Sequence, residues 1–271
     1  MTGSFNRSAV LAIAGRDLRV VRRSRAVLLP SVIVPVLLLL VPPLVLLTAV
    51  DAPSALSDEL RLLLARLPPD IPALPDDPAQ QAVLLLLVYV FAPLFLLVPI
   101  LVASVTAADS VVGERERGTL DALLHSPTTD RELFVGKLLA PWLIATVVTL
   151  VCAACYGVIA NGVLGAYGLP AAFPNRVWVV LVGFVAPGAA GVSLGVIVVI
   201  SARVKTFQEA SQMSGIVVVP IVGMVVAQVA GLFLFDMALL IALGVILWLL
   251  TLLLMRFAVG RFRRDRLITG D

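Results

Sequence analysis

Residues 82–108 read AVLLLLVYVFAPLFLLVPILVASVTAA, a stretch of 27 residues without one charged side chain. An apolar run of about 18 or more residues is typical of a helix that crosses a membrane. Five more such runs lie at 27–50, 138–160, 177–202, 213–235 and 237–255. The sequence therefore predicts an all-α polytopic membrane protein with six transmembrane helices in a single domain, 1–271. Only Asp236 separates the last two runs, so they could instead form one helix and a re-entrant segment.

The overall composition excludes several other classes of protein. Hydrophobic residues make up 61% of the chain and charged residues 14%, whereas a soluble domain is about half apolar and a quarter charged. A soluble enzyme, a disordered tail and a secreted disulfide scaffold are therefore excluded. Two cysteines and one histidine are too few for a Cys/His metal cluster of the usual size, so we predict no metal site.

The basic residues predict the orientation in the membrane. Of the 20 Lys and Arg residues, 17 lie before the first run, between the second and third, between the fourth and fifth, or after the sixth. Cytoplasmic loops carry such an excess. We therefore predict a multi-pass protein of the bacterial plasma (inner) membrane with both termini in the cytoplasm. Because the basic residues sit at membrane edges, the lipid bilayer is a predicted partner and nucleic acid is not.

Two segments outside the runs have a recognisable character. Residues 5–24 combine apolar positions at helical spacing with arginines on another face, which predicts an interfacial helix. It is either a charged anchor or an elbow that steers the first span. Residues 51–81 form an external loop in which the five prolines between 68 and 78 force extended chain; it is a spacer or a lid.

The runs also carry helix-packing signals. Gly191 and Gly195 form a G-x-x-x-G pattern, which predicts a close contact with another helix. Prolines interrupt five of the runs, for example at Pro93. Each proline removes a backbone donor, and neighbouring helices are expected to satisfy the carbonyls that lose it.

Some chemistry is absent from the sequence. No run contains Asp, Glu, Lys, Arg or His, which argues against an ion-coupled carrier and against a membrane enzyme with an ionisable dyad. A phosphate-binding loop at Gly136–Lys137 would need Gly at 131 and Ser or Thr at 138, where the chain has Arg131 and Leu138. We therefore predict no catalytic residues, no ATPase activity and no cofactor bound by this chain.

The most informative segment is the cytosolic loop 109–137. Glu and Arg alternate at 114–117, Gly118 follows, and Thr119 can cap a short helix with Leu120, Leu123 and Leu124 on one face. Thr129 and Glu132 have the spacing of a capping box at the start of a second helix. The first helix either lies on the lipid surface or docks a cytosolic partner; alternating charges suit docking, because they set register and partner choice.

The same loop carries a resemblance to a known family. Residues 113–124 (GERERGTLDALL), Ser126-Pro127, Glu132-Leu133 and 136–140 (GKLLA) resemble the signature of type-2 ABC exporter permeases, nearest to the NatB-like branch of drug and sodium exporters. Residues 22–30 with Pro35, and residues 205–212 with Pro220, resemble the starts of spans one and five in that branch. The segment between spans five and six is shorter than relatives often have.

The resemblance implies a function. The chain would be the permease subunit of an ATP-driven exporter, working by alternating access with a second permease in a homodimer or heterodimer. Two copies of a cytosolic ABC ATPase would bind ATP and Mg²⁺, and the loop would be the coupling helix that docks on them. The uncharged spans favour a hydrophobic or amphiphilic cargo, such as an antibiotic. The alternative is a non-transporting scaffold that recruits a cytosolic partner through the loop. The implied coupling residues are Glu114, Arg115, Glu116, Arg117, Gly118, Thr119, Leu120, Leu123 and Leu124.

Overall fold

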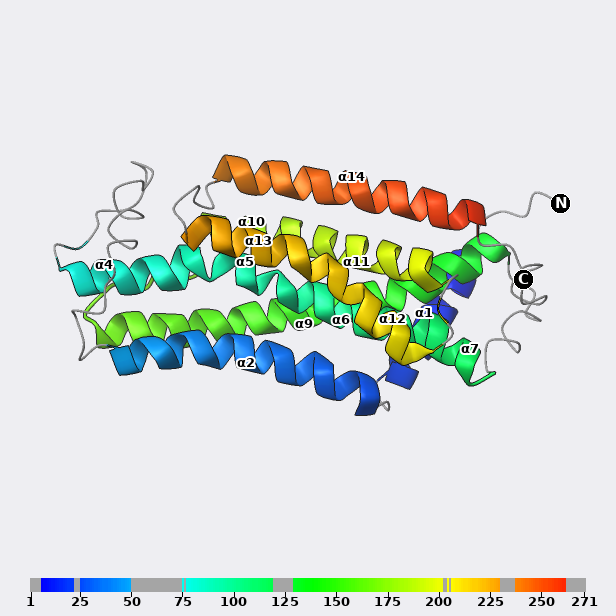
Figure 1. Ribbon diagram of the computed structural model, residues 1–271, viewed down its shortest axis with the longest axis horizontal. Coiled ribbons are helices and arrows are strands. Elements are labelled where there is room, and N and C mark those ends of the chain that lie inside the picture. Colours follow the sequence, from blue (N-terminus) through cyan, green and yellow to red (C-terminus); the bar gives the residue numbers. More distant parts are fainter. Residues whose placement is uncertain are drawn as a thin grey trace.

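The computed structural model describes residues 6–21, 25–49, 75, 77–118, 129–201, 204, 206–229 and 237–261. Every regular element in these ranges is a helix, and the long helices lie side by side as an elongated bundle (Figure 1). Within them, five stretches are long and apolar enough to cross a membrane: Gln80–Glu116, Glu132–Ala166, Arg176–Ser201, Phe207–Gln228 and Met237–Ala258. The predicted run 27–50 falls on a further helix, α2 (Arg25–Ala49), whose apolar segment Pro35–Leu46 is shorter than a span.

The stretch that contains residues 82–108 is built from several short helical elements. It consists of α4 (Pro78–Leu85), η2 (Leu86–Val90), α5 (Ala92–Phe95), α6 (Leu97–Ala108), η3 (Asp109–Gly113) and α7 (Glu114–Glu116). Both η2 and η3 are π-helical turns, a geometry that leaves some carbonyls without the usual partner four residues on. The chain bends at these turns rather than forming one straight helix.

The carbonyls around η2 are satisfied by other helices, as predicted for a span interrupted by proline. Pro93, four residues after Tyr89, has no N–H for the Tyr89 carbonyl. Side chains from three other helices donate to three consecutive η2 carbonyls: Tyr156 Oη to Leu87 O at 2.9 Å, Trp178 Nε1 to Val88 O at 2.8 Å, and Gln228 Nε2 to Tyr89 O at 2.9 Å. The expectation that neighbours satisfy the freed carbonyls is confirmed at Pro93.

Helix α9 (Asp130–Ala166) is the longest element, and α1 (Arg7–Val21) packs along its first half. A β-carbon on Gly136 of α9 would lie 2.9 Å from Ile13 Cβ of α1, so the absence of a side chain at Gly136 allows the close approach. The buried face of α1 is therefore covered by protein. The position of α1 at the membrane interface stays a prediction.

The fourth span runs through α10 (Arg176–Val180), η4 (Leu181–Val185) and α11 (Ala186–Ser201). It lies at the centre of the bundle, because 72% of its apolar window is buried, against 17% for the last span. The last span is α14 (Met237–Arg261), which packs on α11. A β-carbon on Gly191 would lie 2.5 Å from Thr251 Cγ2, and one on Gly195 2.6 Å from Leu254 Cβ. The close helix contact predicted from this G-x-x-x-G pattern is confirmed.

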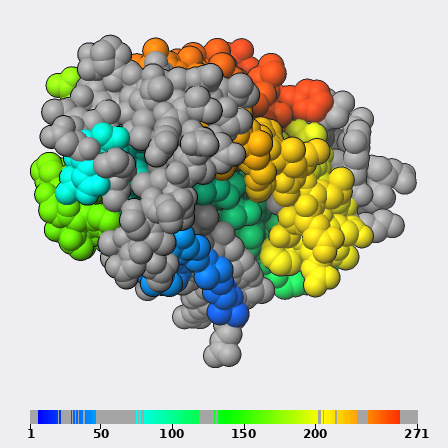
Figure 2. Space-filling view, turned by 60° about the vertical axis from the view of Figure 1, so that its left-hand side comes forward, coloured from blue at the N-terminus to red at the C-terminus, as the bar shows by residue number. Residues whose placement is uncertain are grey.

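The fifth span consists of α12 (Phe207–Ser214), η5 (Gly215–Val217) and α13 (Val218–Val229). In Figure 1, α13 and α14 run in opposite directions along the bundle. This arrangement favours two separate spans over one helix with a re-entrant segment. In Figure 2, part of the surface of α6 is visible between α2 and the α12–α13 face. The part of the predicted loop 51–81 before residue 75 lies outside the described residues.

Most of the charged side chains in the described residues, both basic and acidic, lie at one end of the bundle. Helix α1, α7, the start of α9 and the end of α14 share one end, while α4 and the end of α9 lie at the other (Figure 1). The first end carries Arg16, Arg115, Arg117, Lys137 and Arg256. We call it the α7 end. The loop predicted to couple to a partner therefore lies at the same end as α1 and the end of α14.

Candidate functional site

The α7 end is built around the turn that follows η3. The helix ends at Glu116, and Gly118 adopts φ +68°, a left-handed conformation that glycine reaches without the cost other residues incur. The Gly118 N–H donates to the Arg115 carbonyl at 3.1 Å. The structure thus places a tight turn at Gly118, where the sequence analysis expected the charged stretch to be interrupted.

The predicted coupling residues do not share one environment. Glu116, Arg117 and Gly118 are exposed, Arg115 is partly buried, and Glu114 is buried with 3% of its surface exposed. Thr119, Leu120, Leu123 and Leu124 lie outside the described residues. The exposed tip therefore consists of Glu116, Arg117 and Gly118, whereas Glu114 faces the interior of the protein.

Lys137 is the centre of a buried cluster of charged side chains, which we call the Lys137 cluster (Asp17, Ser110, Glu114 and Lys137). Lys137 Nζ donates to Glu114 Oε2 at 2.5 Å and to the Ser110 carbonyl at 2.8 Å. It also lies 3.9 Å from Asp17 Oδ2. All four residues are at most 4% exposed. A single ammonium group therefore joins α9, α7 and α1.

Arg16 completes the charge balance of the Lys137 cluster from its solvent side. Its partly exposed Nη1 lies 3.3 Å from Asp17 Oδ1 and 3.4 Å from Glu114 Oε1. Two carboxylates thus face two cations. Removing a charge from water is costly unless it is paired and hydrogen-bonded, which explains why these side chains converge.

The pKa of the Asp17 carboxyl is raised above its ordinary value, chiefly because burial disfavours the charged form. Lys137 and Arg16 oppose this shift, as does the hydroxyl of Ser110, which donates to Asp17 Oδ2 at 3.2 Å. The neighbouring carboxylate of Glu114 raises the pKa further. The charged form of Asp17 is therefore costly to keep in this environment.

A second ion pair stabilises the π turn η3 itself. Arg117 Nη1 donates to Asp109 Oδ1 at 2.9 Å, across the whole of η3. A β-carbon on Gly113 would lie 2.9 Å from Asp109 Oδ1 and 3.3 Å from Arg117 Nη1. The lack of a side chain at Gly113 thus leaves the space that the pair occupies. One predicted coupling residue, Arg117, braces the turn that carries the exposed tip.

Two contacts attach α7 to the start of the fifth span. Glu116 Oε2 accepts a hydrogen bond from the Phe207 N–H at 2.9 Å. Arg115 Nη2 donates to the Val204 carbonyl. Thr206 caps α12 by accepting from the Glu209 N–H at 3.2 Å. Arg115 and Glu116 therefore act as links between α7 and α12.

The start of α9 is capped as the sequence predicted. The Thr129 hydroxyl accepts from the Glu132 N–H at 3.3 Å, and Glu132 Oε2 accepts from the Thr129 N–H at 2.9 Å. This is the predicted capping box, and it is confirmed. Glu132 Oε1 also accepts from the Asn6 N–H at 2.6 Å. The same carboxylate thus attaches the beginning of α1 to the beginning of α9.

Sequence reasoning missed the Lys137 cluster. Lys137 was predicted as a basic residue of the cytosolic loop, and Arg16 was placed with other arginines on a face of the interfacial helix apart from its apolar positions. A signal for Asp17 was nonetheless present, because Asp17 continues the helical spacing of Val10, Ile13 and Ala14 and therefore shares their buried face. An acidic residue within an apolar helix face predicts a buried partner.

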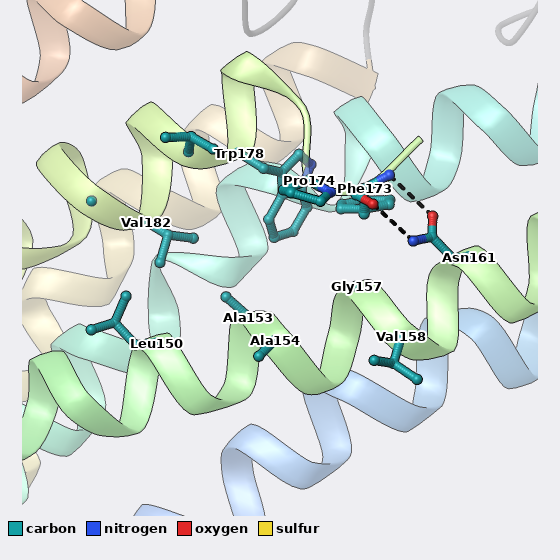
Figure 3. Close-up of a pocket in the computed structure, with 12 residues that line it drawn as sticks. Leu150, Ala153, Ala154, Gly157, Val158, Asn161, Phe173, Pro174, Trp178 and Val182 are labelled. Carbon is teal, nitrogen blue, oxygen red and sulfur yellow. Dashed lines mark hydrogen bonds between the residues drawn. The ribbon is translucent and has the colours of Figure 1, made fainter. Parts of the chain in front are cut away.

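A separate pocket lies in the half of the bundle away from α7 (Figure 3). It has a volume of about 550 Å³ and is formed by α9 on one side and by residues 173–183 on the other. Asn161 holds the opposite wall, since its amide donates to Phe173 O at 2.8 Å and its Oδ1 accepts from the Phe173 N–H at 3.0 Å. Trp178 stacks on Tyr156 with ring centroids 4.9 Å apart behind this wall. None of the described residues that line the pocket is charged, so the pocket suits apolar groups.

The comparison with known families identifies the chain. A family model described as ABC-2 family transporter protein matches residues 11–239. The chain belongs to the ABC-2 transporter family. No curated protein matches it significantly. The matched region includes Asp17, the exposed tip and Lys137, so the α7 end lies within the family domain.

Membership defines the general role of the chain. An ABC-2 protein is a membrane component of a transporter and is not itself an ATPase; it associates with an ABC ATPase. This membrane component is multi-pass, in agreement with the five candidate spans. The NatB-like branch and the coupling roles of individual residues stay predictions.

Proposed function

We propose that this ABC-2 protein is the permease subunit of an ATP-driven exporter and that the α7 end is its coupling site. The observation that carries the proposal is the contrast between the exposed tip and its buried support. Glu116, Arg117 and Gly118 are exposed, while Glu114, two residues before Glu116, is anchored in the Lys137 cluster. Because the exposed tip is anchored in this way, a displacement of the tip by a partner would move the attached helices.

The contacts of α7 provide three routes by which a movement reaches the spans. Glu114 connects α7 to α9 through its hydrogen bond with Lys137, and to α1 through its ion pair with Arg16. Arg115 and Glu116 lead to the segment that begins α12. When the ATPases close on ATP, movement of the tip would shift these helices together, and the proline-interrupted spans would change from an inward-open to an outward-open arrangement. Glu114 acts in this scheme through its internal partners rather than by touching the ATPase.

The proposed assembly contains two permeases and two ATPases. Each permease contributes six spans, with α2 as the first, and its cytoplasmic side is the α7 end in a bacterial inner membrane. The position of α1 and the end of α14 at that end supports cytoplasmic termini (Figure 1). ATP and Mg²⁺ would bind to the partner subunits. Thr119, Leu120, Leu123 and Leu124 would complete the docking surface.

The cargo in this proposal is hydrophobic or amphiphilic. The uncharged cores of the spans and the apolar pocket between α9 and residues 173–183 support it. The walls of the transport path would be the second and fifth spans; α6 is visible between α2 and the α12–α13 face in Figure 2. Sodium fits this chain poorly, because the middle of the spans offers no carboxylate to bind it.

Co-purification with charge reversal tests the coupling site. The tagged protein is isolated from its host in mild detergent, and bound proteins are quantified by mass spectrometry. Wild type is expected to retain an ABC ATPase, and Glu116→Arg to retain much less. Asp77→Arg makes the same change of charge at an exposed position at the opposite end of the bundle, and it should leave the ATPase bound. Equal retention in all three proteins would contradict the assignment.

A measurement of ATP turnover distinguishes the exporter from the scaffold alternative. In proteoliposomes that contain the permease and its ATPase, an exporter should hydrolyse ATP faster when its cargo is added. A panel of hydrophobic cations and antibiotics serves as the probe. Stimulation that is present in wild type and lost in Glu116→Arg supports export. ATPase binding without stimulation by any compound, together with no transport in loaded vesicles, would favour the scaffold.

A further inference from the structure

A groove of about 690 Å³ lies between α9, α11 and α14 towards the α7 end. Its walls are apolar, since nearly all of its accessible surface is formed by apolar atoms. The residues that define it here are Leu138, Trp142, Leu194, Leu252, Met255 and Arg256. The groove is separate from the Lys137 cluster and from the pocket of Figure 3, which share none of these residues.

The polar groups within the groove are already occupied. Trp142 Nε1 donates to the Pro187 carbonyl at 3.0 Å, and Thr251 Oγ1 donates to the Gly188 carbonyl at 3.1 Å. Among the described lining residues, the indole N–H of Trp142 and the hydroxyl proton of Thr251 are therefore not available to a ligand. Such a surface recognises hydrocarbon and excludes polar ligands.

Arg256 differs from the rest of the lining, because it is the one charged residue among the described residues that line the groove. Its side chain is exposed, and it makes no hydrogen bond or salt bridge with any residue in the described parts of the chain. Among the described residues no acidic side chain lines the groove, so the positive charge of Arg256 has no carboxylate partner within this part of the chain. A ligand with an apolar tail and an anionic head matches this distribution of charge.

The dimensions and position of the groove favour a membrane lipid over a soluble ligand. Its α9 wall runs from Phe134 to Trp142, about 12 Å along a helix axis. One leaflet of the hydrocarbon core is about 15 Å thick. Leu252, 57% exposed, opens the groove to the surroundings of the last span. A chain seated there would lie in one leaflet with its head beside Arg256.

We propose that this groove is a binding site for one anionic phospholipid of the leaflet at the α7 end. One acyl chain lies between α9 and α14 against Leu194, and the phosphate pairs with Arg256. The proposal does not depend on the exporter function, because it concerns the lipid that the permease binds at rest. Bound in this way, the lipid would connect the start of α9 to the end of α14.

Native mass spectrometry of the purified full-length chain tests the site. The probes are phosphatidylglycerol, which is anionic, and phosphatidylcholine of the same chains, which carries no net charge. Wild type should retain one phosphatidylglycerol in preference to phosphatidylcholine. Arg256→Gln should lower this preference about fivefold, the effect of losing about 1 kcal/mol for one basic residue near anionic lipid. Arg256→Lys should keep most of it.

Two further variants separate charge from shape. Arg19→Gln removes an exposed arginine of α1 that does not line the groove, and it should leave the preference unchanged. Leu252→Trp fills the groove and should reduce retention of both lipids. Glycerol 3-phosphate, which has the phosphate without the chains, should not compete. Size-exclusion profiles and melting curves show whether each variant is folded; if Arg256→Gln is not, Leu252→Trp and the competition decide.

Three results would overturn the proposal. The first is an unchanged preference in Arg256→Gln, and the second is an equal loss in Arg19→Gln, which would indicate diffuse attraction to the whole end. The third is a change of oligomeric state in Leu252→Trp with unchanged lipid retention. That result would assign the groove to a second copy of the chain.

Discussion

Lys137 Nζ lies 2.5 Å from Glu114 Oε2 in the protein interior, although 22 residues of a loop predicted to reach the cytosol separate the two positions. The pair joins α7 to α9 at the end of the bundle where the coupling partner is proposed to bind. It also explains why Glu114, the first of four alternating charges, faces inward while Glu116 faces out. The alternation in the sequence thus divides between internal support and exposed surface.

Replacing Lys137 by methionine should strongly destabilise the α7 end. The change leaves Glu114 and Asp17 buried with only the partly exposed Arg16 to balance them. Breaking a buried pair in this way typically costs about 3–5 kcal/mol. Melting of the purified protein in detergent, followed by tryptophan fluorescence, measures the loss. The double variant Lys137→Met/Glu114→Gln should recover part of it; a double variant less stable than the single one would contradict the pairing.

Asp17 should make stability depend on pH in a defined direction. Its pKa in the folded protein is raised above 3.8, so its contribution is complete below that value and is lost as the pH rises through the folded pKa. The groups that face it are Lys137, Glu114, Arg16 and Ser110. Asp17→Asn does not titrate. The stability of wild type minus that of Asp17→Asn should therefore fall as the pH rises above about 4, measured by melting.

The carboxylate of Glu114 also faces Asp17, so the comparison needs a control for its charge. Wild type and Asp17→Asn both contain Glu114 and Lys137. Most of the effect of these two residues on stability therefore cancels when the stabilities of the two proteins are subtracted. Repeating the pair of measurements in a Glu114→Gln background checks this point. A difference that rises with pH in either background would mean that Asp17 is stabilised as a carboxylate, contrary to the raised pKa.

A methyl group at Gly191 should weaken the packing of α11 on α14. The new β-carbon would lie 2.5 Å from Thr251 Cγ2, so the two helices must separate or Thr251 must rotate. Overpacking of this kind costs about 1–3 kcal/mol. Gly162→Ala is the matched control, because its β-carbon would meet no atom within 4 Å and alanine has the higher helix propensity. Melting curves should show Gly191→Ala less stable than wild type and Gly162→Ala at least equally stable.

Gln228→Leu should destabilise the contact between the second and fifth spans by about 1 kcal/mol, the usual size of such a bond between membrane helices. The Tyr89 carbonyl would lose the donor that lies 2.9 Å away, and Pro93 has no N–H to replace it. Pro93→Ala supplies that N–H. The cost of Gln228→Leu should therefore be smaller in a Pro93→Ala background. Additive effects in this double-mutant cycle would show that the two donors do not serve the same carbonyl.

Local features of this chain could be predicted from sequence. The Thr129–Glu132 capping box was expected from spacing alone, because both of its hydrogen bonds join residues three apart. The contact at Gly191 and Gly195 was expected because small residues four apart form a smooth strip on any helix. The partner helix was not predictable, since the pattern contains no information about which helix faces it.

The Lys137 cluster shows where prediction from sequence ends. Asp17, Glu114 and Lys137 are far apart in the chain and meet only because α1 packs into the space beside Gly136. Read singly, each of these residues has the character of a membrane-edge charge. The spacing in α1 indicates that Asp17 is buried, but its partners became visible only when α1, α7 and α9 were assembled.

The sequence by itself determined that this is a helical membrane protein of the ABC-2 type with no ATPase motif. Hydrophobicity, the length of the apolar runs and the short charged signature are properties of the order of residues, so they can be recognised from the sequence alone. Only the tertiary structure decided which charges are buried together and which helix packs against Gly191 and Gly195. It also decided where a groove of the size of a lipid chain opens. Those features depend on the distances between segments that are far apart in the chain. The order of residues does not determine these distances, because packing and the desolvation of paired charges depend on which segments meet in the folded protein.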